Sequence, residues 1–476
     1  MIDTVALRNR VLFLAMQGKL VEQDTSDEPA NILISNICKK INDKKYLEDF
    51  REDEIPFAIP KSWKWCRLSN IGSTNIGLIY HPEDIANDGV IVIRSNNIVN
   101  GKMSYIDLVK VNSSIRENQY LNKNDIVICV RNGSKALVGK CAIFDGNSKE
   151  MTFGAFMAVF RTPFYRYVYC YLNTPVFRKN FENDDTKQIN QITQNILKNA
   201  LIPLPPINEQ YRIVDTVDKI FNVLDMIDEL QAQYITDKKV LRTKLLNAGI
   251  QGNLSKQLPE DGSAEDLYEK IRIKKNKLIQ EGKIKKEKAL PVITEEEIPF
   301  DIPANWKWVR LGDISSKISS GSTPAGGNKS DAYVERGYSF FREQNIYDDG
   351  IHEEGLVYIT EELLKTRTNS TVLPMDILLN ITGGSIGRCA LIPDDFTQGS
   401  INQHILIIRM VDPRLRFYVH KYICSPYAQK YIKGNTVGDK DGFSGGRCKN
   451  MLIPLPPLAE QIRIVEKIDE IFANVN

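Results

Sequence analysis

The sequence has 476 residues with 62 basic and 60 acidic side chains, so its net charge of +2 does not by itself indicate a nucleic-acid-binding protein. Hydrophobic residues make up 42% and charged residues 26%, which is ordinary for a globular protein and excludes disorder as the default. The length is sufficient for two domains with connecting helices, and any basic surface must be local.

Cysteine usage and hydropathy exclude further classes. Eight cysteines are scattered without a C-x-x-C pair, which indicates neither a zinc ribbon nor a disulfide framework. No stretch of the sequence approaches the about 20 apolar residues that a membrane-spanning helix needs. We therefore expect a cytoplasmic protein with free thiols that does not contact a membrane.

The N-terminal segment, residues 1–54, is predicted to form a helix followed by a linker. Charged and polar residues interrupt its apolar patch, which is typical of an amphipathic helix rather than a signal peptide. The dipeptide Leu7-Arg8 and the run QGKL at 17–20 recur 234 residues later as Leu-Arg and QGNL. The head of the chain thus resembles a segment in its middle.

The first globular segment, residues 55–205, opens with a motif that occurs twice. Residues 54–73 read EIPFAIPKSWKWCRLSNIGS and residues 297–316 read EIPFDIPANWKWVRLGDISS, with thirteen of twenty positions identical. This similarity predicts an internal duplication in which residues 298–456 form the second globular segment. The tryptophans of the motif are expected to be packing anchors, and they are Trp63, Trp65, Trp306 and Trp308.

Short β-rich runs alternate with Gly, Asn and Asp turns within both segments. The predicted strands include 90–94, 125–130 and 156–161 in the first segment, and 377–380 and 404–410 in the second. Each segment is therefore predicted to be a mixed α/β domain of about 150 residues.

The central segment, residues 206–297, follows a second shared motif. Residues 199–221 match residues 450–472 at fifteen of twenty-three positions, around the run IPLPP-x-x-EQ-x-RIV. Apolar residues then recur mostly at steps of three, four and seven, which predicts a helix from 207 to about 247. Pro205-Pro206 is its expected start signal, and Gly249 and Gly252 are its expected stop. The lysine-rich stretch 271–288 favours a solvated helix or linker over a DNA-binding tail.

A helix of that length, about 60 Å at 1.5 Å per residue, needs a partner along its length. The C-terminal segment, residues 457–476, repeats the beginning of the central segment, while the N-terminal segment repeats its end. The expected partner is therefore the tail of the chain together with its head, paired antiparallel to the central helix. The predicted fold class is α+β, with two mixed α/β domains related by an internal pseudo-two-fold repeat and separated by a long, coiled-coil-like antiparallel helix pair.

Two variable segments that open with IP-x-x-W-x-W-x-R-L, close with IPLPP-x-x-EQ-x-RIV and lead into long helices resemble the specificity subunits of type I restriction-modification systems. The resemblance covers essentially the whole chain. It implies that each α/β domain is a target-recognition domain that reads one half of a split, asymmetric site in double-stranded DNA. It also implies that the helices set the spacing of the half-sites and dock two methyltransferase subunits, and that restriction and translocase subunits join through the complex.

Base reading needs hydrogen-bonding side chains on loops, with Arg suited to guanine and Asn or Gln suited to adenine. Facing water as a turn residue is an equally good interpretation of any single candidate, so the loops are predicted as sets. The candidates in the first domain are Arg94, Ser95, Asn96, Asn97, Arg131, Asn132, Ser134, Lys135, Lys187, Gln188, Asn190 and Gln191. Those in the second domain are Ser322, Thr323, Arg342, Gln344, Asn345, Thr382, Ser385, Lys440 and Arg447.

Positions that are identical in both halves cannot explain why the halves would read different sequences. Arg94 with Arg342, and Asn97 with Asn345, are therefore expected to serve phosphates or the fold, while positions that differ carry the code. Four residues of the second shared motif are expected to brace the helices or to lie at the methyltransferase interface, and they are Glu209, Gln210, Glu460 and Gln461.

An independent enzyme is the main alternative class. The run GSTPAGGNKS at 321–330 lacks the Lys directly after the second glycine that a phosphate-binding loop needs, and four histidines without H-E-x-x-H do not support a metal site. The glycine-rich loop and catalytic motif of a DNA methyltransferase are absent, and the acidic pair at 184–185 lacks the partner lysine of a nuclease. We expect no cofactor and no catalysis by this chain alone. A scaffold that has lost DNA recognition is a further alternative, against which intact polar loops in both domains argue.

Overall fold

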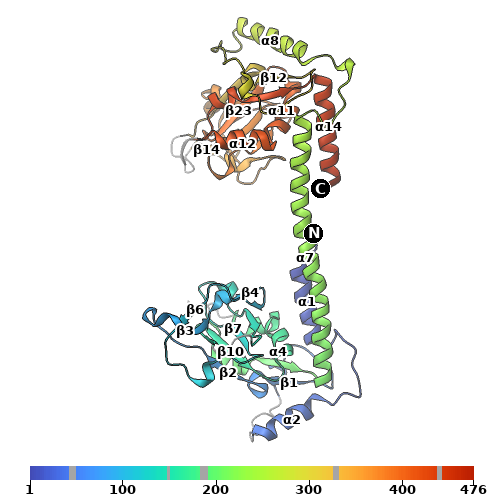
Figure 1. Ribbon diagram of the computed structural model, residues 1–476, viewed down its shortest axis with the longest axis vertical. Helices are drawn as coiled ribbons and strands as arrows, with labels where there is room; N and C mark the ends of the chain where they lie inside the picture. The colour runs from blue at the N-terminus through green and yellow to red at the C-terminus, as the bar shows by residue number, and fades with distance from the viewer. Residues whose placement is uncertain (42–49, 147–150, 183–190, 325–331, 437–441, 476) are drawn as a thin grey trace. The chain divides into compact units, whose positions relative to one another are not determined.

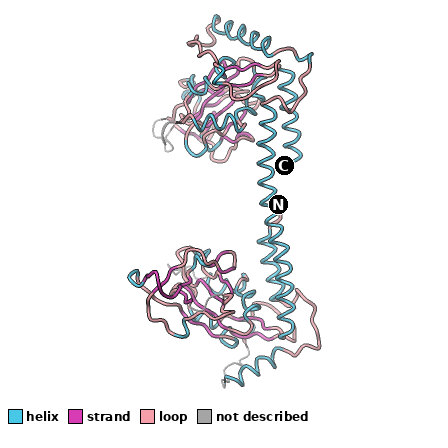
Figure 2. Tube along the Cα trace, viewed as in Figure 1, coloured by secondary structure: helices cyan, strands magenta, loops and turns pink. Residues whose placement is uncertain are grey.

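The computed structural model describes residues 1–41, 50–146, 151–182, 191–324, 332–436 and 442–475. The chain forms two compact units, Met1–Gln233 and Tyr234–Asn476, and the boundary between them falls inside helix α7 (Ile207–Ile250). Each unit contains one α/β domain with a helix pair beside it (Figure 1, Figure 2). No helix in the described ranges is long and apolar enough to span a membrane.

The two shared sequence motifs of each domain meet in one small sheet. In unit 1, β1 (Lys64–Arg67) pairs antiparallel with β11 (Leu201–Leu204). In unit 2, β12 (Lys307–Arg310) pairs in the same way with β24 (Leu452–Leu455). The opening and closing motifs are kept in both halves because together they close each domain where it joins α7 or α14 (Leu458–Val475).

The main sheet of each domain has four antiparallel strands in the same order. That order is β2-β10-β7-β8 in unit 1 and β13-β23-β20-β21 in unit 2, which confirms the predicted duplication of two mixed α/β domains. The strands of unit 1 are β2 Ser73–Ile76, β7 Ile126–Cys129, β8 Cys141–Ile143 and β10 Met157–Arg161. Those of unit 2 are β13 Ser315–Ser320, β20 Ile377–Asn380, β21 Cys389–Leu391 and β23 Ile405–Met410.

The central strand β7 is apolar at every position because hydrophobic cores cover both faces of the sheet. Ile126 and Ile128 pack in a core shared with α4 (Tyr165–Leu172) and α7, while Val127 and Cys129 pack in a second core on the opposite face. Alternate residues of a strand point to opposite faces, so a strand buried on both sides has no polar positions. In unit 2, Ile377 and Leu379 of β20 lie in one core and Leu378 in another.

A second sheet and several helices complete each domain. In unit 1 the sheet order is β6-β3-β9, with β3 Ile85–Ile93, β6 Val109–Val111 and β9 Met151–Phe153, and the further helices are α2 Ala30–Ile41, α3 Leu68–Ile71, α5 Pro175–Glu182 and α6 Gln194–Asn199. In unit 2 the order is β14-β18-β15-β22-β19, with β14 Tyr333–Val334, β15 Tyr338–Phe341, β18 Val357–Ile359, β19 Thr371–Val372 and β22 Gly399–Ile401, and the further helices are α9 Leu311–Ile314, α10 Glu361–Lys365, α11 Arg416–Ile423, α12 Pro426–Gly434 and α13 Gly445–Asn450.

Helix α7 is paired antiparallel within each unit, as predicted. In unit 1, α1 (Thr4–Met16) lies along α7, and the Thr4 hydroxyl donates to Asp228 Oδ1 over 2.6 Å. In unit 2, α14 lies along the other part of α7, and the Tyr234 hydroxyl donates to the main-chain oxygen of Val475 over 2.6 Å. Head and tail therefore each supply a partner for α7 in their own unit.

The prediction that Gly249 helps to stop the central helix is wrong. Helix α7 continues through Gly249 to Ile250, and the left-handed residue that follows is Gly252, with φ of +74°. A Cβ at position 249 would lie 3.1 Å from Ile464 and 3.2 Å from Ile468 on α14. Glycine is therefore present because the two helices approach closely there.

The lysine-rich stretch 271–288 lies partly in α8 (Ala264–Gln280), which agrees with the predicted solvated helix or linker. Ser263 caps this helix by accepting from the main-chain nitrogen of Asp266. Lys275 donates to the main-chain oxygen of Gly312 over 2.6 Å, so at least one lysine of the stretch holds the linker to the domain.

Candidate nucleic-acid interface

Three strand ends of the main sheet meet along one edge of unit 1. The register pairs Ile76 with Ala158 and Cys129 with Met157, so the ends of β2 and β7 lie beside the start of β10. We define the recognition edge of unit 1 as the loops that leave these strand ends, together with the segments bonded to them. Its residues are 77–80, 94–96, 130–135, 154–156 and 191.

Hydrogen bonds join the predicted loops of the first domain at this edge. The main-chain nitrogen of Ile192 donates to Val130 over 2.8 Å, and Gln191 forms an antiparallel bridge with Arg131. Asn132 Nδ2 donates to Ser95 Oγ over 3.3 Å. The edge therefore unites three segments that lie far apart in the sequence. Its exposed candidates are Asn96, Arg131, Ser134, Lys135 and Gln191, while Lys187, Gln188 and Asn190 lie outside the described residues.

The candidate asparagines shared by both halves form hydrogen bonds within their own domains. Asn97 is fully buried and its amide nitrogen donates to the main-chain oxygens of Ser104 and Ile106 over 3.1 and 3.0 Å. Asn345 is equally buried and donates to His352 and Glu354 over 2.9 and 3.2 Å. These two asparagines are therefore structural, and we remove them from the set of candidate DNA contacts.

The shared arginines are half-buried beside these asparagines. Arg94 Nη2 donates to the main-chain oxygen of Asp107 over 2.9 Å, and Asn96 Nδ2 donates to the carboxylate of the same residue over 2.9 Å. Arg342 Nη2 donates to the main-chain oxygen of Gly355, and Gln344 donates to that oxygen over 3.5 Å. The two arginines thus hydrogen-bond to equivalent turns of their own domains.

Unit 2 has an equivalent edge of its own. The register pairs Ser320 with Leu406 and Asn380 with Ile405, so the ends of β13 and β20 lie beside the start of β23. Asn380 Nδ2 donates to the main-chain oxygen of Glu343 over 2.8 Å. The recognition edge of unit 2 consists of residues 321–324, 342–344, 381–385, 402–404 and 442–447.

Most candidates of the second domain lie on this edge and hold partners there. Thr382 Oγ1 lies 2.6 Å from His404 Nδ1, Thr323 donates to Gln403, and Ser385 accepts from Asn380 over 3.2 Å. Ser322 accepts from Arg367 over 3.1 Å. Arg447 donates to the main-chain oxygen of Asn435 at the periphery of the edge, and Lys440 lies outside the described residues.

Each recognition edge also contains a residue that was not among the predicted contacts. These residues are Phe156, immediately before β10, and His404, immediately before β23. Phe156 and His404 were predicted as the first residues of strands, but the ladders begin one residue later, at Met157 and Ile405. Phe156 is 57% exposed as a result. No signal in the sequence distinguishes these two positions, because the halves share little sequence between their common motifs.

Four residues of the second shared motif brace the junction between strand and helix instead of facing outward. Trp63 Nε1 donates to Glu209 Oε2 over 2.9 Å in unit 1, and Trp306 Nε1 donates to Glu460 Oε2 over 2.8 Å in unit 2. Burial raises the pKa of Glu209, and the hydrogen bond from Trp63 acts against that shift. All four side chains are buried, and they are those of Glu209, Gln210, Glu460 and Gln461. We therefore withdraw these residues as candidates for partner docking.

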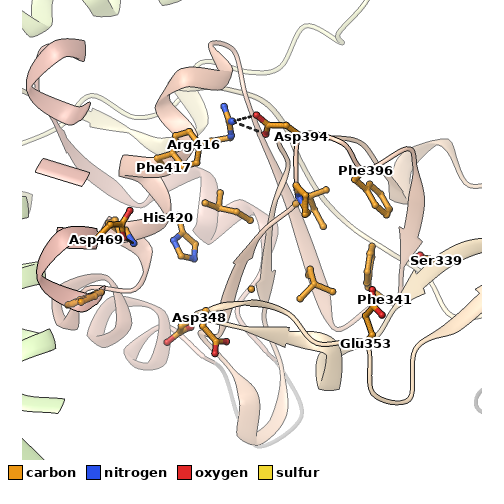
Figure 3. A pocket seen from close by; sticks show the side chains of 18 of the residues that line it. Ser339, Phe341, Asp348, Glu353, Asp394, Phe396, Arg416, Phe417, His420 and Asp469 are labelled. Atoms are coloured by element: carbon orange, nitrogen blue, oxygen red, sulfur yellow. Dashed lines mark hydrogen bonds and ion pairs between the residues drawn. The ribbon is translucent and has the colours of Figure 1, made fainter. Parts of the chain in front are cut away.

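A separate cavity of about 810 Å³ lies in unit 2 beside α11 and α14 (Figure 3). An ion pair closes one side, where Arg416 lies 2.8 Å from Asp394, and the buried His420 faces the interior. None of the predicted DNA contacts that the structure describes lines this cavity. A hollow of about 490 Å³ stands at the corresponding place in unit 1, with Tyr169 where unit 2 has His420. Among the described residues, no group of three His, Cys, Asp or Glu side chains is arranged to hold a metal ion.

A family model described as the type I restriction modification DNA specificity domain matches residues 60–233 and matches again at residues 303–476. The chain belongs to this family. Each match runs from the IP-x-x-W-x-W motif through one α/β domain into the helix that follows it, so the chain carries two DNA specificity domains.

Curated relatives extend this similarity over the full length of the chain. The specificity subunit of the type I restriction enzyme EcoAI from Escherichia coli is 24% identical over 540 residues, which cover 99% of this chain and 89% of the relative. The EcoKI specificity subunit from Escherichia coli strain K12 is 24% identical over 430 residues, which cover 87% of this chain and 83% of the relative.

Solved structures share the fold. A structure from work on the complex assembly and conformational transition of a type I R-M system has a TM-score of 0.62 and 18% identity, and the alignment covers 88% of this chain and 92% of that one. The HsdS subunit from Thermoanaerobacter tengcongensis has a TM-score of 0.50 and 19% identity, with 89% and 92% covered.

Proposed function

We propose that this chain is the DNA sequence-recognition subunit of a type I restriction-modification enzyme and that each unit reads one half of a bipartite, asymmetric site. One observation carries the proposal: both units gather loops at the same end of the same four-stranded sheet, while the side chains on those loops differ. A constant framework with variable loops is what two readers of different half-sites require.

The exposed side chains of unit 1 are suited to a polyanion. Arg131 and Lys135 offer cationic donors, and Asn96 and Gln191 offer amides of the kind that contact adenine. In unit 2, Gly383 and Gly384 stand next to Thr382, and no atom of the described residues lies within 4 Å of a Cβ added to either glycine. Backbone at these glycines has room to approach a phosphate closely.

We propose no catalytic step for this chain by itself. The chemistry would belong to two methyltransferase subunits and to restriction and translocase subunits, with which the chain would assemble in the cytoplasm. An apolar stripe on α7 fits the docking of a partner helix, because Val223, Met226 and Leu230 recur at steps of three and four and are each more than half exposed. This stripe replaces the buried Glu209 and Gln210 as the proposed docking surface.

A selection from random DNA sequences tests the proposal. The full chain, assembled with the methyltransferase subunits of its own system, should enrich one split motif with a fixed gap. A matched variant that carries Arg131→Ala and Lys135→Ala should lose sequence preference in one half of that motif only. Enrichment of no motif by an intact complex would contradict the proposal and favour the scaffold interpretation.

A further inference from the structure

The two recognition edges place different side chains at four equivalent positions. Strand pairing fixes the equivalence, since Val130 and Ile381 donate their main-chain nitrogens to Phe156 and His404 over 3.0 and 2.9 Å. Gly77 and Gly321 mark a second shared contact, where an added Cβ would lie 2.2 Å from Gly154 O and 2.4 Å from Asn402 O respectively. The equivalent pairs, counted from these anchors, are Ile79 with Thr323, Arg131 with Thr382, Ala155 with Gln403, and Phe156 with His404.

In unit 1 these positions form an apolar hollow beside a cation. Ile79 is 74% exposed and Phe156 is 57% exposed, and both line a cavity of about 630 Å³. The guanidinium of Arg131 lies 5.2 Å from the centre of the Phe156 ring. Large apolar side chains gathered in an open hollow indicate a surface that a ligand covers. The feature of a DNA base edge that matches such a hollow is the C5-methyl group of thymine in the major groove.

In unit 2 the same positions form a chain of hydrogen bonds. Thr323 donates to Gln403 Oε1, Gln403 Nε2 lies 3.1 Å from His404 Nε2, and His404 Nδ1 lies 2.6 Å from Thr382 Oγ1. Because an amide nitrogen can only donate, His404 accepts at Nε2, carries its proton on Nδ1 and donates that proton to Thr382.

Two hydrogen-bond donors of this network of side chains remain available to a ligand. In the described part of the chain, the Thr382 hydroxyl hydrogen and the second amide hydrogen of Gln403 have no acceptor. Gln403 is exposed, so its amide is accessible from solvent. Guanine presents two acceptors, O6 and N7, at its major-groove edge, whereas adenine presents one acceptor with one donor and thymine presents one acceptor with a methyl group.

Resting on the proposed function, we propose that the sheet edge of unit 1 reads a thymine through the hollow of Ile79 and Phe156, and that the sheet edge of unit 2 reads a guanine through donors on Thr382 and Gln403. Arg131 positions the Phe156 ring, and His404 holds the two donors of unit 2 in place. The same four framework positions thus carry two different base chemistries.

Base analogues test this assignment on duplexes that contain the selected site, with the full chain in complex with its methyltransferase subunits. Deoxyuridine in place of one thymine in the half-site of unit 1 removes only a methyl group and should weaken binding about three- to five-fold. 7-Deazaguanine in place of one guanine in the half-site of unit 2 removes only the N7 acceptor and should weaken binding about five- to twenty-fold.

Two matched variants connect each effect to its edge. Phe156→Ala should abolish the effect of deoxyuridine on binding and leave the effect of 7-deazaguanine intact. Thr382→Val should abolish the effect of 7-deazaguanine and leave the effect of deoxyuridine intact. Phe156 is exposed and Thr382 is half-buried, and site-specific binding to the unchanged half-site reports that each variant is folded.

A half-site for unit 1 without any A·T pair would overturn the inference, and so would analogues that have no effect while binding stays site-specific. In those cases the proposed function would stand. Loss of all sequence preference in the unmodified complex would instead overturn the proposed function, and this inference with it.

Discussion

At the scale of single residues, the structure separates framework side chains from exposed ones on the same loop. Asn97 and Asn96 are neighbours in sequence, yet Asn97 is fully buried and donates to two main-chain oxygens while Asn96 is exposed. The repeat made the distinction predictable, since the buried asparagine recurs as Asn345 whereas Asn96 is replaced by Gln344. Identity between the halves marks the fold, and difference marks the candidates for recognition.

Substituting these neighbours should therefore change the stability of unit 1 by very different amounts. Asn97→Ala removes a fully buried amide together with its two hydrogen bonds and should lower the stability of unit 1 by about 1–3 kcal/mol. Asn96→Ala should change stability by less than about 0.5 kcal/mol, because it affects one exposed hydrogen bond. Thermal unfolding of the two variants compares them directly, and equal melting temperatures would contradict the structural role given to Asn97.

Other residues of the edge could not be placed from the sequence. Phe156 and His404 lie in runs that read as continuous strands, and only the register shows that pairing starts one residue later. The hydrogen bond between Thr382 and His404 joins residues 22 positions apart, and no periodicity reports such a contact. Loop geometry depends on tertiary packing, whereas strand patterns are local.

At the scale of elements, each domain is fastened to its helix by a buried tryptophan and a buried carboxylate. The shared motifs predicted that Trp63 would be buried, but the partner of its indole nitrogen, Glu209, lies 146 residues away and was revealed only by the fold. Helix limits were predicted well where proline marks an entry, as before Ile207, and less well at Gly249, where close helix packing explains the glycine.

Glu209→Gln and Glu209→Ala should differ in their effect on stability. The alanine variant leaves the buried indole nitrogen of Trp63 without an acceptor and should cost about 1–3 kcal/mol, whereas glutamine keeps an acceptor oxygen there.

Burial raises the pKa of Glu209 above its value in the unfolded chain, so the native state loses stability as the pH rises through that pKa and the carboxyl ionises. As the pH is lowered from 7 to 5, the melting temperature of the wild type should therefore rise relative to that of Glu209→Gln, which has no carboxyl group to protonate at this position. A difference that does not depend on pH would contradict this.

Replacing Gly249 tests the close approach of α7 and α14. Gly249→Leu places a side chain where Ile464 and Ile468 already lie 3.1 and 3.2 Å from the Cβ position, and should destabilise the helix pair by about 1–3 kcal/mol. Gly384→Ala is the control, because no atom in the part of the chain that the structure describes lies within 4 Å of its Cβ position. Circular dichroism during thermal unfolding measures both variants, and a Gly249→Leu variant as stable as the control would show that the helices are not closely packed there.

At the scale of the whole molecule, the duplication was evident from the sequence, because two motif pairs recur at nearly constant offsets. The two α/β domains and the antiparallel pairing within each unit followed from it. The DNA sequence that each domain reads did not follow, because a side chain selects its base through loop geometry that a single sequence does not specify.

If α7 sets the gap between half-sites, inserting seven helix-forming residues after Gln233 should lengthen that gap. Seven residues add about 10 Å of helix, which corresponds to about three base pairs of B-DNA. Both half-site sequences should stay unchanged, since the insertion leaves both recognition edges intact. Selection from random DNA measures the gap, and a longer helix with an unchanged gap would show that other elements set the spacing.

We propose that the two units of this chain together direct a methyltransferase to one split DNA site. The most direct test of this proposal is to co-express the chain with the methyltransferase subunit of its system and to map methylated adenines across a genome. We expect methylation at a single bipartite motif with a fixed gap, and loss of sequence preference in one half of the motif when Arg131 and Lys135 are both replaced by alanine. Methylation without a common motif, or a well-formed complex that leaves the genome unmethylated, would contradict it.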